Sequence, residues 1–254
     1  MVDIATYNRK AWEAECRKKN PWTVAYKEEI LANAKKGKPY LLLTPLKEVP
    51  SAWYLPIRDK DVLCLASGGG QQTSQFSAMG ARTTVLDNSQ TQLDSDITVS
   101  KREGLDITTV LGDMRDLSCF TDESFDLIFH PVSNCFVDDI QKVWKECFRV
   151  LRKGGRLLVG ITNPVMYIFD GEAEEKGRLE VRFPIPFSDT DYPELAQGRM
   201  KNNEPLEFSH TLEEQLGGIC DAGLSIISLY SDTRDDLSSK CVHDAFLAIL
   251  ARKN

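Results

Sequence analysis

The sequence predicts an α/β protein built on a seven-stranded, mostly parallel, doubly wound sheet with one antiparallel strand. Three observations lead to this fold class. Short apolar runs alternate with helical patterns between Asp61 and Ile161. A glycine-rich turn, Gly68–Gly70, follows the first of these runs. Two further apolar runs near the C-terminus are joined by a polar loop so short that they should pair antiparallel.

The region from Asp61 to Asn88 resembles half of a nucleotide-binding βαβ unit. A strand at 61–66 leads into Ser67-Gly68-Gly69-Gly70, then a helix, then a second strand ending in Asp87. Glycines allow a sharp turn and close approach of a ligand, and the following helix directs free N–H groups toward that ligand. Asp87 lies 19 residues after Gly68, where an acid can accept hydrogen bonds from ribose hydroxyls. The region therefore predicts a site for an adenosine-containing cofactor.

The later elements follow in order. A helix is expected over 93–102 with Ser89 as its cap, and Asp138 or Asp139 should cap a second helix that carries one apolar stripe and ends at Lys153-Gly154-Gly155. Strands are expected at 105–111, 124–130 and 156–161. Thr211-x-x-Glu214 is a capping box, and the helix it opens should bury Leu212, Leu216, Ile219 and Cys220. Strands at 224–230 and 245–251, joined by the loop 231–240, complete the sheet.

Composition restricts the function classes. The net charge of −7 gives no sign of a nucleic-acid partner, and no apolar run reaches the ~18 residues of a membrane span. The N-terminus lacks the basic and apolar regions of a signal peptide. Seven widely spaced cysteines without a C-x-x-C pair indicate a reducing compartment, and Cys64, Cys147 and Cys220 occupy core-like positions. We expect a cytoplasmic protein; its oligomeric state is open.

Three functions compete at this point. The dinucleotide fingerprint has glycine at its sixth position, where this chain has Thr73, and no Tyr-x-x-x-Lys pair occurs. A nicotinamide-dependent reductase of similar topology is therefore the second choice among enzymes. A non-catalytic cofactor-binding protein is the third alternative. The leading prediction is an enzyme acting on a small molecule.

Four motifs together resemble the class I S-adenosylmethionine-dependent methyltransferases, especially the ubiquinone- and menaquinone-type branch. They are Val62–Gly70, Val85–Ser89, Gly112–Met114, and Phe125–His130 followed by Val150–Leu158. The resemblance covers 61–161 well and the C-terminal segment more loosely. It implies S-adenosyl-L-methionine as cofactor, S-adenosyl-L-homocysteine as product, and a Rossmann-like methyltransferase fold.

The resemblance also implies residue roles. The glycine turn with Ser67 would approach the methionine part of the cofactor, Asp87 would hold the ribose, and Asn88 and Ser89 would flank the adenosine. Asp113 would accept from the adenine amino group and Met114 would pack on the ring. His130 and Pro131 would lie near the sulfonium. The segment 130–134 lacks the acid or amide and the stacking aromatic common in nucleic-acid amino methyltransferases, so a nucleic-acid base is not the expected substrate.

A catalytic base is needed only if the acceptor must lose a proton. His130 is the candidate, because imidazole titrates near neutrality, although a strand-end histidine bonded to backbone is the simpler interpretation. A magnesium site could be formed by Asn134, Asp138 and Asp139. The simpler interpretation is that Asn134 is a loop amide and that one of the acids caps a helix, so no metal is expected.

We expect one domain spanning 1–254. Residues 59–162 and 211–254 would form the core, 1–58 an N-terminal lid, and 163–210 a substrate-side insertion. Both appendages are rich in aromatic residues, which indicate either satellite cores or an aromatic-lined substrate pocket. Tyr7, Trp12, Asn134 and Tyr167 are the candidate substrate or lid residues.

Overall fold

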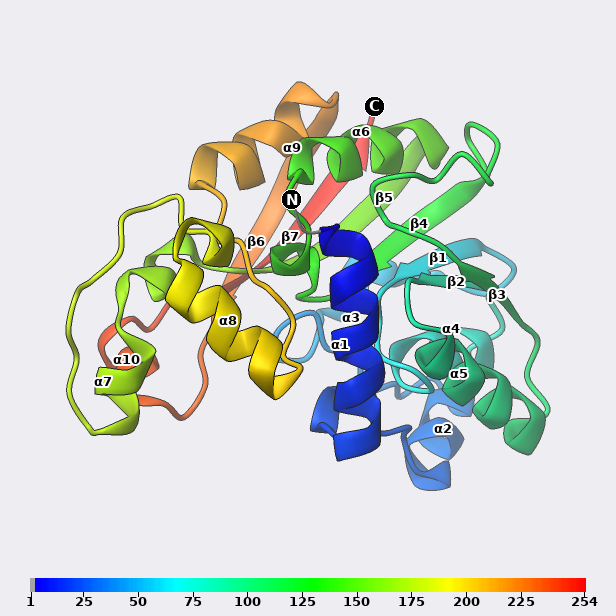
Figure 1. Ribbon diagram of the computed structural model, residues 1–254. Helices are drawn as coiled ribbons and strands as arrows, with labels where there is room; N and C mark the ends of the chain where they lie inside the picture. Colours follow the sequence, from blue (N-terminus) through cyan, green and yellow to red (C-terminus); the bar gives the residue numbers. More distant parts are fainter. Residues whose placement is uncertain (1–2) are drawn as a thin grey trace.

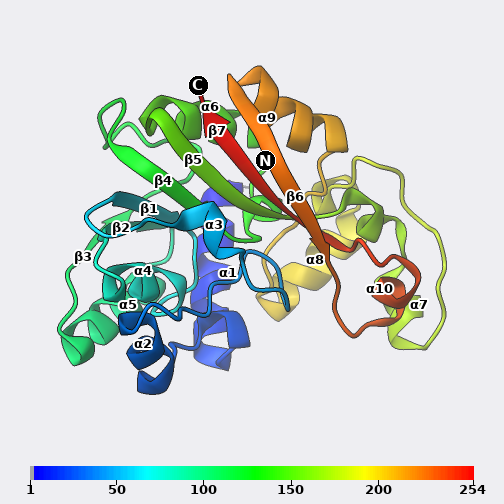
Figure 2. The ribbon, with the colours of Figure 1, turned by 180° about the vertical axis from the view of Figure 1, so that it is seen from behind.

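The computed structural model describes residues 3–254 and shows one seven-stranded sheet in the order β3-β2-β1-β4-β5-β7-β6 (Figures 1 and 2). β7 pairs antiparallel with both β5 and β6, and the remaining pairs are parallel. The predicted fold class is confirmed. The strands are β1 (Asp61–Leu65), β2 (Arg82–Asp87), β3 (Ile107–Leu111), β4 (Phe125–His130), β5 (Leu151–Thr162), β6 (Leu224–Asp232) and β7 (Phe246–Lys253).

Alternation of side chains along the central strands creates two hydrophobic cores. In β1, Leu63 and Leu65 face a core with Trp144, whereas Val62 and Cys64 face a core with Phe76. The first core lies under α6 (Ile140–Val150) and α9 (Gly218–Asp221), and the second lies under α3 (Ser51–Tyr54), α4 (Gln72–Ala78) and α5 (Gln90–Glu103). Helices therefore cover both faces of the sheet (Figure 1). The first glycine turn and the carboxyl ends of β1, β2 and β4 are held at one edge by this packing.

The remaining helices belong mostly to the two appendages. The N-terminal segment contains α1 (Ile4–Lys18) and α2 (Glu28–Lys35), and the insertion contains α7 (Gly171–Glu175) and α8 (Pro193–Asn202). A short α10 (Leu237–Cys241) lies in the β6–β7 connection beside α7, as both views show (Figures 1 and 2). The Ser238 N–H donates to Glu174 Oε1 at 2.7 Å and ties these two short helices together.

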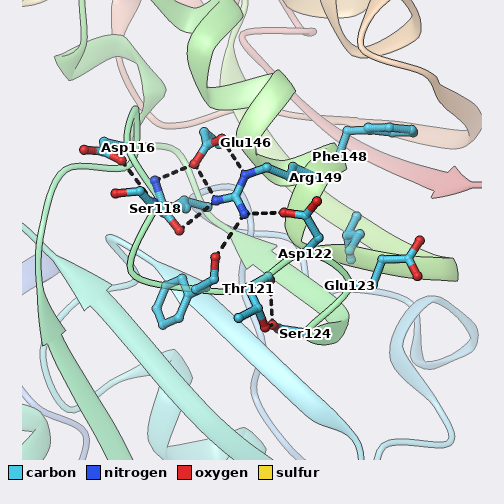
Figure 3. Close-up of polar contacts among 12 residues, drawn as sticks. Asp116, Ser118, Thr121, Asp122, Glu123, Ser124, Glu146, Phe148 and Arg149 are labelled. Atoms are coloured by element: carbon cyan, nitrogen blue, oxygen red, sulfur yellow. Dashed lines mark hydrogen bonds and ion pairs between the residues drawn. The ribbon is translucent and has the colours of Figure 1, made fainter.

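A loop connects β3 to β4 and carries the third motif at its start. Arg149 on α6 anchors this loop, because its guanidinium donates to the carbonyls of Leu117 at 2.8 Å and Phe120 at 3.0 Å (Figure 3). The Glu146 carboxylate accepts from the Leu117 N–H at 2.7 Å and also pairs with Arg149. These bonds satisfy loop backbone groups that a crossover helix would have satisfied internally. The start of the loop is held at the end of β2 by a separate bond, from the Gly112 N–H to the Asp87 carbonyl at 3.0 Å.

Two local predictions were wrong. The helix expected to end at Lys153-Gly154-Gly155 ends at Val150, and β5 begins at the next residue. The capping box is confirmed, since the Glu214 N–H donates to Thr211 Oγ1 and the Thr211 N–H to Glu214 Oε2. A π-helical turn over Glu213–Gly217 then rotates the helix, leaving Leu212 46% exposed and Cys220 exposed while Ile219 is buried. The extra residue in the turn shifts the phase on which the apolar-face prediction rested.

No helix within residues 3–254 combines the length and the apolar character needed to cross a bilayer.

Candidate functional site

A cavity of about 1,210 Å³ opens at the carboxyl ends of β1, β2 and β4. Its lining comes mainly from the loops that follow β1, β2, β3 and β4, from the N-terminal segment and from the 163–210 insertion. Of the residues expected in the cofactor site, Ser67, Gly68, Asp87, Asn88, Asp113, Met114 and Pro131 line the cavity. Sheets of this kind bind ligands at this edge.

The glycine turn is packed closely by neighbouring segments of the chain. Gly68 has φ of 75°, and a Cβ placed on it would lie 2.9 Å from the Trp22 carbonyl oxygen. The next two amides are engaged by α5: the Gly69 N–H donates to Gln92 Oε1 at 3.0 Å and the Gly70 N–H to Asp96 Oδ1 at 2.9 Å. Gly69 and Gly70 thus shape the turn, whereas Gly68 borders the cavity.

The N-terminal segment is joined to the same turn. Gln71 Nε2 donates to the carbonyls of Pro21 at 2.9 Å and Val24 at 2.8 Å, and the Tyr26 N–H donates to the Gly70 carbonyl at 3.1 Å. Residues 20–26 therefore form a wall over the glycine turn, and Trp22 lines the cavity.

Asp87 ends β2 as predicted and is largely buried. Its Oδ1 accepts the Ser89 N–H at 2.8 Å, and burial raises the pKa of its carboxyl to about 7. Ser89 itself caps α5 through the Gln92 N–H and does not line the cavity. Asp87 and Asn88 both line the cavity at the end of β2.

Asp113 and Met114 border the cavity from the start of the loop after β3. The Asp113 carboxylate is held by Arg115, whose Nη2 lies 2.6 Å from Asp113 Oδ2, and Arg115 also pairs with Asp138. Asp113 is thus fixed in place by an ion pair. Asp139 caps α6 through the Lys142 N–H, so both acids considered for a metal site have structural partners.

His130 is the sequence candidate that the geometry supports least. It is fully buried, its ring lies 6.2 Å from that of Trp144, and it does not line the cavity. Neither ring nitrogen has a hydrogen-bond partner within the described residues, and burial lowers the pKa of the imidazole to about 3. Such a group stays neutral inside the core and cannot reach a ligand at the sheet edge. This placement argues against a role as general base.

The four candidate lid or substrate residues separate into two pairs. Trp12 and Tyr167 line the cavity, whereas Tyr7 and Asn134 do not. The Tyr7 hydroxyl donates to the Glu204 carbonyl at 2.8 Å, joining α1 to the insertion. Asn134 is buried and donates to Gln215 Oε1 at 2.8 Å. Asn134 thus ties the loop after β4 to the π-helical turn at Glu213–Gly217.

Comparisons with known proteins identify the family. A family model described as a methyltransferase domain matches residues 63–159. The uncharacterized methyltransferase YbaJ of Bacillus subtilis (strain 168) is 45% identical over 247 residues, which cover 96% of each chain. This chain belongs to the S-adenosylmethionine-dependent methyltransferases. Its cofactor is S-adenosyl-L-methionine, and the reductase considered from the sequence is set aside.

More distant matches to this chain are also methyltransferases. The sterol 24-C-methyltransferase of Aspergillus fumigatus is 32% identical over 141 residues, 54% of this chain and 36% of that protein. A methyltransferase structure from Mesorhizobium loti is 19% identical with a TM-score of 0.60, covering 80% of this chain and 94% of that one. The structure of 1,6-didemethyltoxoflavin-N1-methyltransferase from Burkholderia thailandensis is 15% identical with a TM-score of 0.60, covering 99% and 89%. It contains that substrate and S-adenosylhomocysteine. These two likenesses concern the fold.

The methyltransferase also has cavity residues that sequence reasoning missed. Gln71 and Gln92 tie the glycine turn to its neighbours, and both line the cavity. The insertion adds Arg199 and Glu207, which form an ion pair with Nη1 to Oε1 at 3.1 Å. The Gln71-Gln72 pair directly after the glycines was a visible signal. Arg199 and Glu207 lie in a segment without hydrophobic periodicity, and no sequence signal marked them.

Proposed function

We propose that this methyltransferase transfers the methyl group of S-adenosylmethionine to a small-molecule acceptor held inside the cavity. The observation that carries the proposal is that one cavity is lined both by the cofactor-motif residues and by the two appendages outside the core. An acceptor in that cavity would lie between the sheet edge and the insertion. The net charge of −7 is unfavourable for a polyanionic substrate such as nucleic acid.

The residues present fit the cofactor. Gly68 brings the backbone of the turn to the cavity without a side chain, and Asp87 and Asn88 offer acceptors at the end of β2. Met114 and the ion-paired Asp113 border the same cavity. In this proposal Gly68 and Ser67 lie along the methionine part, Asp87 holds the ribose hydroxyls, and Asp113 with Met114 receives the adenine.

The bound cofactor supplies an activated methyl group on a sulfonium, and the chain supplies position and shielding from water. In-line displacement depends strongly on orientation, so a preformed turn and a fixed acid contribute through geometry. Pro131, which lines the cavity after β4, would limit the space beside the reacting carbon. No described group of three or more histidine, cysteine or acidic residues is arranged to hold a metal ion.

We assign residues 1–40 and 163–210 to a lid over the core. Residues 41–58, which the sequence analysis placed in the lid, contribute Leu41, Trp53 and Ile57 to the second hydrophobic core. Asn8 supports this assignment, since its Nδ2 donates to the Phe136 carbonyl at 2.8 Å and the Leu206 carbonyl at 3.0 Å. The Leu206 N–H returns a bond to Asn8 Oδ1 at 2.8 Å. One side chain thus links α1, the loop after β4 and the end of the insertion. A cytoplasmic location fits the seven cysteines, all described and all in the thiol form.

The proposal is tested with S-adenosylmethionine that carries a labelled methyl group. The purified enzyme is incubated with three fractions of a Bacillus subtilis lysate, the organism of the 45% identical relative: small molecules, protein and nucleic acid. Label is expected in the small-molecule fraction, and an Asp87→Ala variant serves as the control for cofactor-dependent transfer. Label only in protein or nucleic acid would refute the small-molecule proposal.

A further inference from the structure

The insertion places a connected polar cluster in the cavity wall. The Tyr167 hydroxyl donates to Glu207 Oε2 at 2.9 Å, and the other oxygen of Glu207 accepts from Arg199 at 3.1 Å. Arg199 also lies 2.6 Å from Asp189 Oδ2. All four residues line the cavity. None of them belongs to the cofactor motifs, so they are candidates for contact with the acceptor rather than with the cofactor.

The state of the Tyr167 hydroxyl follows from its partners. Burial raises its pKa well above the usual value, with the charge of Glu207 adding to the effect. The phenol therefore stays protonated, and its O–H donates the hydrogen bond to Glu207. Its oxygen then has only lone pairs left to offer, and it can accept a hydrogen bond from an O–H or N–H group in the cavity. Burial likewise raises the pKa of the neighbouring Cys135 thiol, which stays neutral.

Aromatic rings surround the cluster and favour a flat ligand. Tyr167 and Phe187 stack with centroids 5.7 Å apart and an interplanar angle of 23°. Phe183 packs on Phe187 at 5.1 Å, and both rings line the cavity together with Phe169. Tyr192 also stacks on Phe187, with centroids 5.7 Å apart and an interplanar angle of 12°, so the ring surface left for a ligand is that of the half-buried Tyr167 and Phe169. A planar ring can lie against this surface, whereas a bulky saturated ligand buries less of it.

The charges of the insertion disfavour an anionic ligand. Its acidic cavity residues are Asp170, Glu172, Glu174, Glu175, Asp189, Glu194, Glu204 and Glu207, against the two arginines Arg182 and Arg199. Both arginines are already paired, Arg182 with Asp170 at 2.7 Å and Arg199 with two acids. A carboxylate or phosphate on the ligand would find no free cation in this wall, as far as the described residues show.

We infer that Tyr167 binds the acceptor, and that the acceptor is a planar aromatic or heteroaromatic molecule with an O–H or ring N–H and no anionic group. The inference rests on the proposed function and names the substrate class of the same cavity. The bond from the acceptor O or N to the methyl carbon forms while the sulfur–methyl bond breaks, and the electron pair of that bond stays on sulfur. The acceptor proton passes to the Tyr167 oxygen as the Tyr167 proton passes to Glu207, which balances the charge lost by the sulfonium.

The experiment measures binding to the enzyme loaded with S-adenosylhomocysteine, so it does not need the natural acceptor. The probes are naphthol, methoxynaphthalene without the O–H, naphthoate with a charge, and saturated decahydronaphthol. Naphthol should bind at least tenfold more tightly than naphthoate and decahydronaphthol. Tyr167→Phe should weaken the binding of naphthol about tenfold, the effect of one lost hydrogen bond, and should leave the binding of methoxynaphthalene unchanged. Tyr192→Phe is the matched control, because Tyr192 stacks on Phe187 but does not line the cavity.

Glu207 acts through Tyr167 and is a positioning residue. Glu207→Gln should weaken the binding of naphthol but not that of methoxynaphthalene, whereas a purely structural defect would weaken the binding of both probes. Equal naphthol affinity in the parent and Tyr167→Phe, or naphthoate binding as tightly as naphthol, would overturn the inference. The small-molecule proposal fails separately, through label transfer to protein or nucleic acid. Label in small molecules combined with insensitivity to Tyr167→Phe would overturn this inference alone.

Discussion

Replacing Gly68 with alanine tests whether the glycine turn and the N-terminal wall act as one unit. Gly68 has φ of 75°, and the added Cβ would lie 2.9 Å from both the Trp22 carbonyl oxygen and Gln71 Oε1. Gly104 offers a matched control, since its φ is 63° and a Cβ there meets nothing within 4 Å. Both substitutions place alanine in left-handed backbone, and only one of them collides with neighbours.

The magnitudes differ in a way that can be worked out. Left-handed backbone costs alanine about 1–2 kcal/mol at either position. At Gly68 the collision also displaces Gln71, whose two hydrogen bonds to Pro21 and Val24 contribute about 1 kcal/mol each. Gly68→Ala should therefore destabilise the fold by about 3–4 kcal/mol, and Gly104→Ala by about 1–2 kcal/mol.

The assay combines urea denaturation with calorimetric titration of S-adenosylhomocysteine. Gly104→Ala should bind the cofactor product as tightly as the parent, because the end of α5 is remote from the cavity lining. Gly68→Ala should lose at least tenfold in affinity. If the two variants lose equal stability and both keep full affinity, the close contact between turn and wall has no role in the site.

Three further predictions concern buried polar groups. Burial raises the pKa of Asp96 to about 8, so the folded chain keeps a proton that the unfolded chain releases near pH 4, and stability falls as pH rises through this window. Asp96→Asn should flatten that fall in urea denaturation, and an unchanged slope would contradict it. The pKa of His130, lowered to about 3, makes stability fall as pH drops below about 6.5, and His130→Leu should remove this loss; a variant as acid-sensitive as the parent would refute the assignment. Asn8→Ala leaves buried backbone groups unpaired, should cost about 1–3 kcal/mol, and should speed hydrogen exchange in α1 and in 204–208; unchanged exchange there would remove Asn8 as the link.

Much of the core could be predicted because its signals are local. Alternating burial, a glycine turn and the capping residues Ser89 and Asp139 each depend on neighbours a few positions away. The same locality explains the errors. A π-helical turn at 213–217 adds one residue to a helical turn, and no periodicity argument can detect that phase shift. Gly154 has the features of a residue that ends a helix. It lies instead inside β5, where its φ is 79°.

The site was only partly predictable for a related reason. Most motif residues at or after the strand ends line the cavity, since parallel strands align their ends at one edge. His130 also ends a strand, but the alternation of side chains points it at Trp144 in the core. Tyr167, Arg199 and Glu207 come together only through the long insertion, whose contacts are non-local. Sequence patterns carry no information about which distant segments meet.

Calorimetric titration of S-adenosylhomocysteine into the parent and an Asp87→Ala variant tests the central claim most directly, namely that the cavity at the end of β2 is the cofactor site. The titration is done at pH 8, above the pKa of about 7 for the Asp87 carboxyl, so that the parent carries the charged acceptor. Asp94→Ala, on the exposed side of α5, is the control. The account predicts about 10- to 100-fold weaker binding for Asp87→Ala, the effect of lost hydrogen bonds to a charged group, and no change for Asp94→Ala. Equal affinity in all three proteins would contradict the account.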